Sequence, residues 1–173
     1  MNLELYSTLV GIGVIILFIL SLIILFNKSL KDKITLKIYY LFISIISGIS
    51  IIGALTYEYI YYLDPCYYCW VERIFLFPLF LIGAISGIKN IEKNYFLIFI
   101  FSIIGLILTI YHTTLQYLSM FSIASVDTKC SLTGPSCVGN DGVEVFGFIT
   151  IPAMGVLTFI SILILTFIIR KKA

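Results

Sequence analysis

Charged residues are scarce in this sequence: aspartate, glutamate, lysine and arginine make up only 12% of its 173 residues. A soluble domain carries about 25%, because its surface must be wetted. Hydrophobic residues reach 61%, and the mean hydropathy is +1.13. The shortage of charge excludes a soluble globular enzyme and a disordered chain, and a net charge of only +2 excludes a nucleic-acid-binding protein. An integral membrane protein is the class that remains.

Two further absences narrow the chemistry and the organisation. Histidine occurs once, at position 112, and the sequence has no motif for haem, flavin or an iron–sulfur cluster. It also has no internal repeat of useful period and no low-complexity linker. We therefore expect one compact helical unit.

The hydrophobic residues are grouped in five long runs. Crossing a hydrocarbon core of about 30 Å takes roughly 20 apolar residues in a helix, whereas barrel strands show alternation over about ten residues. The runs are Leu5–Phe26, Ile38–Tyr62, Val71–Ile88, Tyr95–Tyr117 and Val145–Ile169. They predict five transmembrane helices, and the last helix should start near Ile151 because Pro152 is tolerated in a first turn.

The basic residues predict the orientation of these helices. If the runs alternate across the membrane, most lysines and arginines fall on one side: Lys28, Lys31, Lys33, Lys37, Lys89, Lys93, Arg170, Lys171 and Lys172. Only Arg73 and Lys129 fall on the other side. The positive-inside rule then places the N-terminus outside and the C-terminus in the cytoplasm.

The first run has a second interpretation, as a signal peptide. Glu4 stands where a basic segment is expected, and lysines follow the run instead of preceding it. The run also exceeds the roughly 7–15 residues of a signal-peptide core, and no small-residue cleavage site follows it. We therefore expect a retained transmembrane helix.

All four cysteines lie in the two outer segments between the runs. Cys66 and Cys69 form a CxxC pair, and Cys130 and Cys137 form a C-x6-C pair. Cysteine is readily buried, so cysteines scattered at random over so apolar a chain would fall mostly within the helices. Two pairs facing an oxidising compartment indicate two disulfides, Cys66–Cys69 and Cys130–Cys137.

Three roles are open for these pairs. Structural disulfides are one, since closing the Cys130–Cys137 loop would contribute roughly 2.5 kcal/mol. Zinc binding is another, but the second pair has the wrong spacing and neither loop contains a histidine. A CxxC ring is tight, often reducible and typical of thiol–disulfide oxidoreductases, which favours redox-active pairs.

The residues near the CxxC pair leave alternatives of their own. Cys69 precedes an apolar helix, whose N-terminal N–H groups favour a thiolate, and Arg73 lies one turn further on the same face. Arg73 is either a lipid-headgroup anchor or a counter-ion for a thiolate or a reduced acceptor. His112 is either an interhelical hydrogen-bonding residue or a residue at a bound cofactor or in proton uptake. Glu72 is expected to pair locally, and Glu58 is unassigned.

Two pairs of thiols cannot dispose of electrons indefinitely, so a catalytic thiol oxidase needs a terminal acceptor. Because no motif for a bound redox group is present, a lipid-soluble quinone is the acceptor left by exclusion. A pocket between helices close to Cys69 and Arg73 would be accessible to it.

Several motifs in register resemble the DsbB family of disulfide bond formation proteins, its BdbC-type members most closely. Residues 65–73, PCYYCWVER, followed by Phe77 and Pro78, resemble the family's PCxxCWxxR…YP signature. Residues 111–116 resemble its YHxxxQ segment, and residues 146–152 resemble its FGFxxIP stretch. The order of the two cysteine pairs is also that of the family, and the resemblance covers about residues 38–169.

This resemblance implies a route for electrons. A reduced DsbA-like, thioredoxin-fold oxidase attacks Cys130, and Cys137 is freed to attack Cys66. Cys69, as a thiolate, then meets the quinone, ubiquinone or menaquinone, with Arg73 stabilising the complex and His112 beside the cofactor. No metal is expected. Glu72, a position at which many BdbC-type members carry glutamine, adds an acid near Cys69 that would offset part of the help from Arg73.

The resemblance also implies an all-α membrane protein: a four-helix transmembrane bundle plus one extra N-terminal transmembrane helix. Residues 1–37 would hold the extra helix and a cytoplasmic loop, and residues 38–173 the redox unit. The expected location is the bacterial cytoplasmic membrane, with the active cysteines on the outer side. Two alternatives stay open: a quinone reductase like vitamin K epoxide reductase, whose cysteine pairs have the reverse order, and a structural membrane protein with two stapling disulfides.

Overall fold

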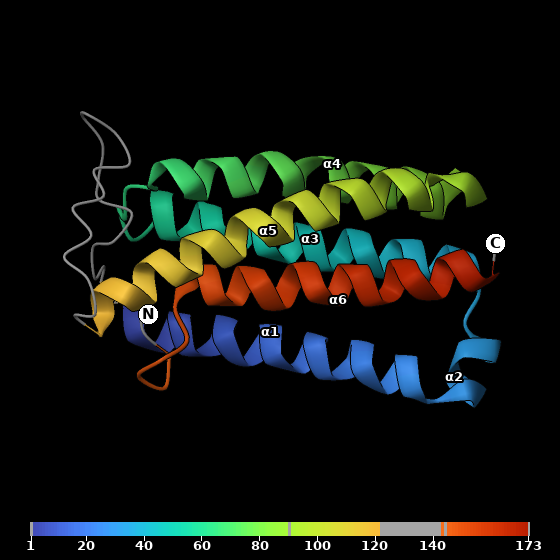
Figure 1. The fold of residues 1–173 in the computed structure, drawn as a ribbon, viewed down its shortest axis with the longest axis horizontal. Helices are drawn as coiled ribbons and strands as arrows, with labels where there is room; N and C mark the ends of the chain where they lie inside the picture. The colour runs from blue at the N-terminus through green and yellow to red at the C-terminus, as the bar shows by residue number, and fades with distance from the viewer. Residues whose placement is uncertain (1, 90, 122–142, 144, 173) are drawn as a thin grey trace.

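The computed structural model describes residues 2–89, 91–121, 143 and 145–172 of the chain (Figure 1). Over these residues the chain is helical, and its single β interaction is an isolated bridge between Val145 and Ile149. The elements are α1 (Leu3–Phe26), α2 (Lys28–Lys33), α3 (Leu36–Tyr59), α4 (Tyr67–Lys89), the 3-10 turn η1 (Glu92–Asn94), α5 (Tyr95–Met120) and α6 (Ile151–Lys172).

Five of these helices, α1, α3, α4, α5 and α6, are long and apolar enough to cross a membrane. The 24 residues of α1 or of α3 rise roughly 36 Å, more than the thickness of a hydrocarbon core. The predicted all-α membrane protein with five spanning helices is confirmed. The short α2 was not predicted from the sequence; Asn27 caps it by accepting a hydrogen bond from the Leu30 N–H at 3.2 Å.

The turn between α3 and α4 differs from the sequence-based boundaries. Helix α3 ends at Tyr59, three residues before the predicted Tyr62, which adopts a left-handed φ of 55°. Helix α4 begins at Tyr67, four residues before the predicted Val71. The earlier start places Cys69 inside the first helical turn and leaves Cys66 immediately before it.

Helices α3, α4, α5 and α6 form a closed four-helix bundle, in which each helix packs against two neighbours. Helix α1 lies outside this ring, along α6 (Figure 1). The largest fully buried side chains of the bundle lie toward the end opposite the α3–α4 turn, among them Tyr39, Tyr40, Ile43, Leu79, Ile98, Phe159 and Ile162. The bundle therefore has its densest apolar core away from the cysteines.

Small residues set the distance between several helices. A Cβ on Gly105 of α5 would come within 2.3 Å of Phe159 on α6, so glycine is needed for that contact. A Cβ on Gly11 of α1 would lie 3.1 Å from Val145 and 3.3 Å from Met154. Close approach at small residues is the usual way for membrane helices to pack, and here it brings α1 against the start of α6.

The two ends of the molecule carry different residues (Figure 1). The N-terminus, the α3–α4 turn and the start of α6 lie at one end, and α2, η1 and the C-terminus lie at the other. The basic residues of α2 and η1 are thus gathered with those that end α6, as the sequence predicted for one membrane side.

Candidate active site

The CxxC pair lies at the start of α4, where Pro65 ends the connection from α3. Cys66 occupies the N-cap position: its carbonyl oxygen accepts from the Trp70 N–H at 3.3 Å, and its Sγ accepts from the Cys69 N–H at 3.4 Å. The two sulfur atoms lie 3.2 Å apart and share a hydrogen bond, so the pair is a dithiol in this structure. The predicted Cys66–Cys69 disulfide remains a prediction.

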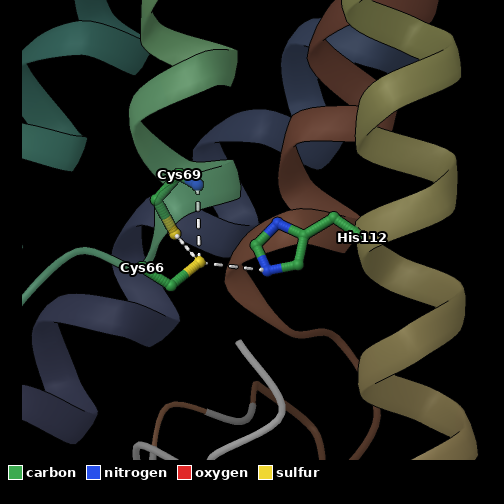
Figure 2. Close-up of side chains that lie close together, drawn as sticks. All are labelled: Cys66, Cys69 and His112. Carbon is green, nitrogen blue, oxygen red and sulfur yellow. Dashed lines mark hydrogen bonds between the residues drawn. The ribbon is translucent and has the colours of Figure 1, made fainter. Parts of the chain in front are cut away.

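A histidine from another helix contacts Cys66 (Figure 2). His112 on α5 places Nε2 3.5 Å from the Cys66 Sγ, and its other ring nitrogen, Nδ1, lies 2.8 Å from Oε1 of Glu72. Only 2% of His112 and 6% of Cys66 are exposed. A carboxylate, an imidazole and a thiol are therefore connected in a row inside the protein.

These contacts favour the thiolate form of Cys66. The largest cause is the hydrogen bond with Cys69, and the hydrogen bond and charge of His112 add to it. Burial alone would raise the pKa of the Cys66 thiol, but these contacts outweigh it and lower that pKa to about 4. A thiol of low pKa leaves readily in disulfide exchange. The sequence predicted helix-terminal stabilisation for Cys69, but the early start of α4 directs the Cys69 N–H to Cys66 instead.

Arg73 faces the interior of the protein and does not extend to the lipid headgroups, because it is only 5% exposed. One guanidinium nitrogen pairs with Glu58 of α3, and the second donates to the Ala54 carbonyl at 3.0 Å. The guanidinium carbon also lies 5.1 Å from the ring of Trp70. Its Nε is buried and has no hydrogen-bond partner among the described residues. One charge-bearing donor of Arg73 is thus left for another group.

A cavity of about 640 Å³ lies beside this arginine, lined by residues of α1, α3, α4 and α6 and of the connection between α3 and α4. Ligand pockets commonly measure about 300–1,000 Å³. Cys69, Glu72 and Arg73 line the cavity, whereas Cys66 and His112 do not. The two cysteines therefore have different surroundings: Cys66 contacts the histidine, and Cys69 borders the cavity.

The residues around this cavity fit a quinone. Most lining side chains are apolar, as a quinone ring and tail require, and the unpartnered Nε of Arg73 matches a carbonyl oxygen. Arg73 and Cys69, predicted on one face of the helix, do line the same space. His112, predicted beside the cofactor, contacts Cys66 and is not among the residues that line this cavity, and its role at a cofactor stays a prediction.

The same thiols also have the donor set of a metal site. Ligand atoms of Cys66, Cys69 and His112 all lie within 4.8 Å of one another. The sequence disfavoured zinc because neither cysteine loop contains a histidine, but the fold supplies one from α5. The expectation of no metal remains a prediction.

The structure gives partners to two acidic residues: Glu58, which the sequence left unassigned, and Glu72, which was expected to pair locally. Glu58 pairs with Arg73, and Glu72 pairs with His112 on a different helix and not locally. Acids inside membrane helices are rare and usually functional, and that signal was available in the sequence. Cys130 and Cys137 lie outside the described residues, so their pairing and their place beside Cys66 stay predictions.

Comparison with known proteins places the chain in a family. Residues 34–169 match the family described as "Disulfide bond formation protein DsbB". The "SPbeta prophage-derived disulfide bond formation protein B" of Bacillus subtilis is 32% identical over 71% of this chain and 79% of its own. The "Probable disulfide formation protein" of Metapseudomonas resinovorans is 34% identical over 74% and 86%.

A third relative agrees, the "Probable disulfide formation protein C 1" of Bacillus cereus, 33% identical over 73% of this chain and 87% of its own. No solved structure matches the chain. The five apolar helices, the CxxC pair with its buried Cys66 and the family match over residues 34–169 agree with one another. The chain is a multi-pass membrane protein that belongs to the DsbB family of disulfide bond formation proteins.

Proposed function

We propose that this protein is a quinone-dependent protein-disulfide oxidoreductase that reoxidises a DsbA-like, thioredoxin-fold oxidase outside the cytoplasm. The observation that carries the proposal is the position of the CxxC pair. Cys66 contacts a histidine in the protein interior, while Cys69 borders a cavity that also exposes Arg73. In this proposal, Cys66 takes part in thiol exchange and Cys69 meets the electron acceptor.

The proposed reaction has three exchanges, each of which moves two electrons and two protons. The partner's two thiols become a disulfide as the Cys130–Cys137 disulfide is reduced. Cys137 then attacks Cys66, which breaks the Cys66–Cys69 bond and releases Cys69; Cys130 completes the exchange by attacking Cys137. Cys66 leaves in that step, and the Cys66–Cys69 disulfide forms again when the pair is reoxidised.

The environment of Cys66 suits its part in this cycle. Cys66 must leave as a thiolate when Cys130 attacks Cys137 in the Cys66–Cys137 disulfide. A leaving thiol of low pKa makes this exchange faster. His112, held by Glu72, stabilises that thiolate and is placed to exchange a proton with it. In this proposal, His112 acts on Cys66, and Glu72 orients the imidazole ring of His112.

A bound quinone supplies a two-electron, two-proton acceptor for the reduced CxxC pair. Arg73 would hold a carbonyl oxygen through its unpartnered Nε, while Glu58 and Ala54 fix the guanidinium in place. Most other side chains that line the cavity are apolar, which would limit the access of water to Cys69.

We further propose the bacterial cytoplasmic membrane as the location, with the N-terminus and the cysteines outside and the C-terminus in the cytoplasm. Nine basic residues on the opposite side from the cysteines support this orientation. Residues 38–173 would form the redox unit and residues 1–37 an added segment. A reporter fused after Ala173 should be active only in the cytoplasm, and activity only outside would reverse the orientation.

The experiment that tests the activity uses the purified protein with a reduced thioredoxin-like partner and a quinone. We expect one quinol for each partner disulfide formed, and none with the Cys66→Ser protein. Reduction of a quinone epoxide at the expense of the partner's thiols would instead favour a vitamin K-type reductase, against which the order of the cysteine pairs already speaks. Two disulfides that resist reduction by the partner would favour a structural role.

A further inference from the structure

The cavity beside Cys69 has one wall that comes from outside the four-helix bundle. Helix α1 contributes residues along almost half its length to the lining, among them Tyr6, Leu9, Gly13 and Leu17. This helix precedes the family match, which begins at residue 34. The family therefore does not account for this wall.

The charged residues of the lining lie at one end of the cavity, and the rest is mostly apolar, with the hydroxyls of Ser50 and Thr158 donating to carbonyls of their own helices. Cys69 and Arg73 lie in the first two turns of α4, at the same end of the molecule as Tyr6. Toward the other end, the lining continues with Leu17 of α1 and Ile49 of α3. From Tyr6 to Leu17, α1 rises roughly 16 Å. This shape suits a ligand with a polar head and an apolar tail.

The cavity also opens sideways between α1 and α3. Leu9, Ile16 and Ile52 line it and are nevertheless 53%, 51% and 65% exposed. In a membrane-spanning region such exposure faces lipid. An apolar tail can therefore enter from the bilayer without crossing the bundle.

Contacts at both sides hold α1 in position. The Tyr6 ring packs against Tyr57 at 5.1 Å and Tyr61 at 5.2 Å, and its hydroxyl donates to the Gly53 carbonyl at 3.4 Å. On its other face, α1 fits against the start of α6 at Gly11. These contacts fix α1 against α3 on one side and against the start of α6 on the other.

We propose that α1 forms the wall along which the apolar tail of a membrane quinone lies, and that it sets which tails this protein accepts. The inference rests on the proposed quinone-dependent function. The head of the quinone lies at Cys69 and Arg73, and the tail follows α1 past Gly13 and leaves between Ile16 and Ile52. A lipid acyl chain is the other occupant that this space would hold.

The test adds a side chain at Gly13, where a Cβ would meet no atom within 4 Å. Gly13→Leu fills the path of the tail and also improves the helix propensity, so folding should be retained. The matched control is Ile12→Phe, which adds bulk one residue away, at a 40% exposed position outside the lining. Each protein is assayed with a decyl-tailed benzoquinone and with the same benzoquinone without a tail.

We expect Gly13→Leu to raise the apparent KM for the tailed quinone roughly tenfold, the change expected when about two methylene groups lose their contacts. The KM for the tail-less quinone and both KM values of Ile12→Phe should stay unchanged. Binding is measured separately from activity by quenching of the fluorescence of Trp70, the only tryptophan, which adjoins Arg73. The tailed quinone should bind Gly13→Leu correspondingly more weakly.

The outcomes separate this inference from the proposed function. A wild-type protein that reduces neither quinone would overturn the proposed function and this inference with it. A wild-type protein that reduces both, beside a Gly13→Leu protein whose constants for the tailed quinone are unchanged, would overturn the inference alone and leave the cavity wall to lipid. An equal rise in the apparent KM for the tailed and the tail-less quinone would also overturn the inference, because the substitution at Gly13 would then affect binding of the quinone head and not of the tail.

Discussion

The two cysteines of the CxxC motif are three residues apart, but they have opposite surroundings. Cys66 is the N-cap of α4 and contacts an imidazole that is itself held by a carboxylate. Cys69 is in the first turn and borders the cavity together with Arg73. The start of a helix thus divides one dithiol between two environments, an imidazole contact for Cys66 and a cavity for Cys69, which we propose serve thiol exchange and an electron acceptor.

Glu72 belongs to both environments. Its carboxylate contacts His112, and its side chain also lines the cavity. The charges on the two sides are arranged in parallel, because each basic group has its own acid: Glu72 for His112 and Glu58 for Arg73. Buried charges are tolerated only when they are paired in this way, so loss of Glu58 should affect mainly the cavity side, whereas loss of Glu72 should affect both sides.

The largest effect is expected from Cys130→Ser. Oxidation of the partner should fall to background, because the entry pair is gone, while quinone should still keep Cys66 and Cys69 oxidised. Alkylation of free thiols followed by mass spectrometry reports both pairs in one sample. If the partner were captured on Cys66 of the unaltered protein, using a partner without its resolving cysteine, the assignment of the entry pair would be reversed.

Arg73→Lys should affect only the cavity side. A charge-assisted hydrogen bond contributes roughly 1.5–3 kcal/mol, and lysine cannot reproduce the planar fork of arginine. We expect the apparent KM for quinone to rise about tenfold to a hundredfold, with unchanged formation of the mixed disulfide with the partner. Glu58→Gln serves as a graded control, with a smaller rise. Unchanged quinone kinetics in a folded Arg73→Lys protein would leave Arg73 as a structural residue.

His112→Ala should affect only the other side. The pKa of Cys66 is lowered to about 4, so the thiolate persists as the pH falls from neutrality and is lost only as the pH passes through that value. Without His112 the loss should occur about one to two pH units higher. The pH dependence of iodoacetamide labelling of the reduced protein, with the labelled peptide identified, measures this shift. A changed KM for quinone would contradict the separation of the two sides, because His112 does not line the cavity.

The smallest effect is expected from removing metal ions. Chelators should leave turnover unchanged, since the proposed cycle uses Cys66 and Cys69 as thiols. Added Zn²⁺ should inhibit the reduced protein, because both sulfurs and His112 are within reach of one ion. Activity that is lost with a chelator and restored by Zn²⁺ would show that the cluster is a metal site.

The sequence was sufficient for the parts of this account that depend on local pattern. Apolar runs of about 20 residues predicted the five helices, and Pro152 marked the start of α6. The residues 65–73 pointed to the CxxC pair and to Arg73. Helix periodicity also placed Cys69 and Arg73 on one face, which the shared cavity bears out.

The sequence was insufficient where a contact joins distant segments. Glu72 and His112 are 40 residues apart, and only the packing of α4 on α5 brings them together. The wall from α1 is another such case, because no local signal shows that α1 lies beside α3 and α6. The early start of α4 was missed because Tyr67, Tyr68 and Cys69 are not strongly hydrophobic, although Cys66 can cap the helix through its sulfur.

We propose that Cys66 exchanges disulfides with Cys130 and Cys137, whereas Cys69 meets the electron acceptor. Two matched double variants distinguish these roles. Cys69→Ser with Cys130→Ser leaves Cys66 and Cys137, and Cys66→Ser with Cys130→Ser leaves Cys69 and Cys137. After mild oxidation, peptide mass spectrometry measures the disulfide in each. We expect a Cys66–Cys137 disulfide in nearly all of the first protein and little disulfide in the second. Equal or preferential formation of Cys69–Cys137 would contradict it.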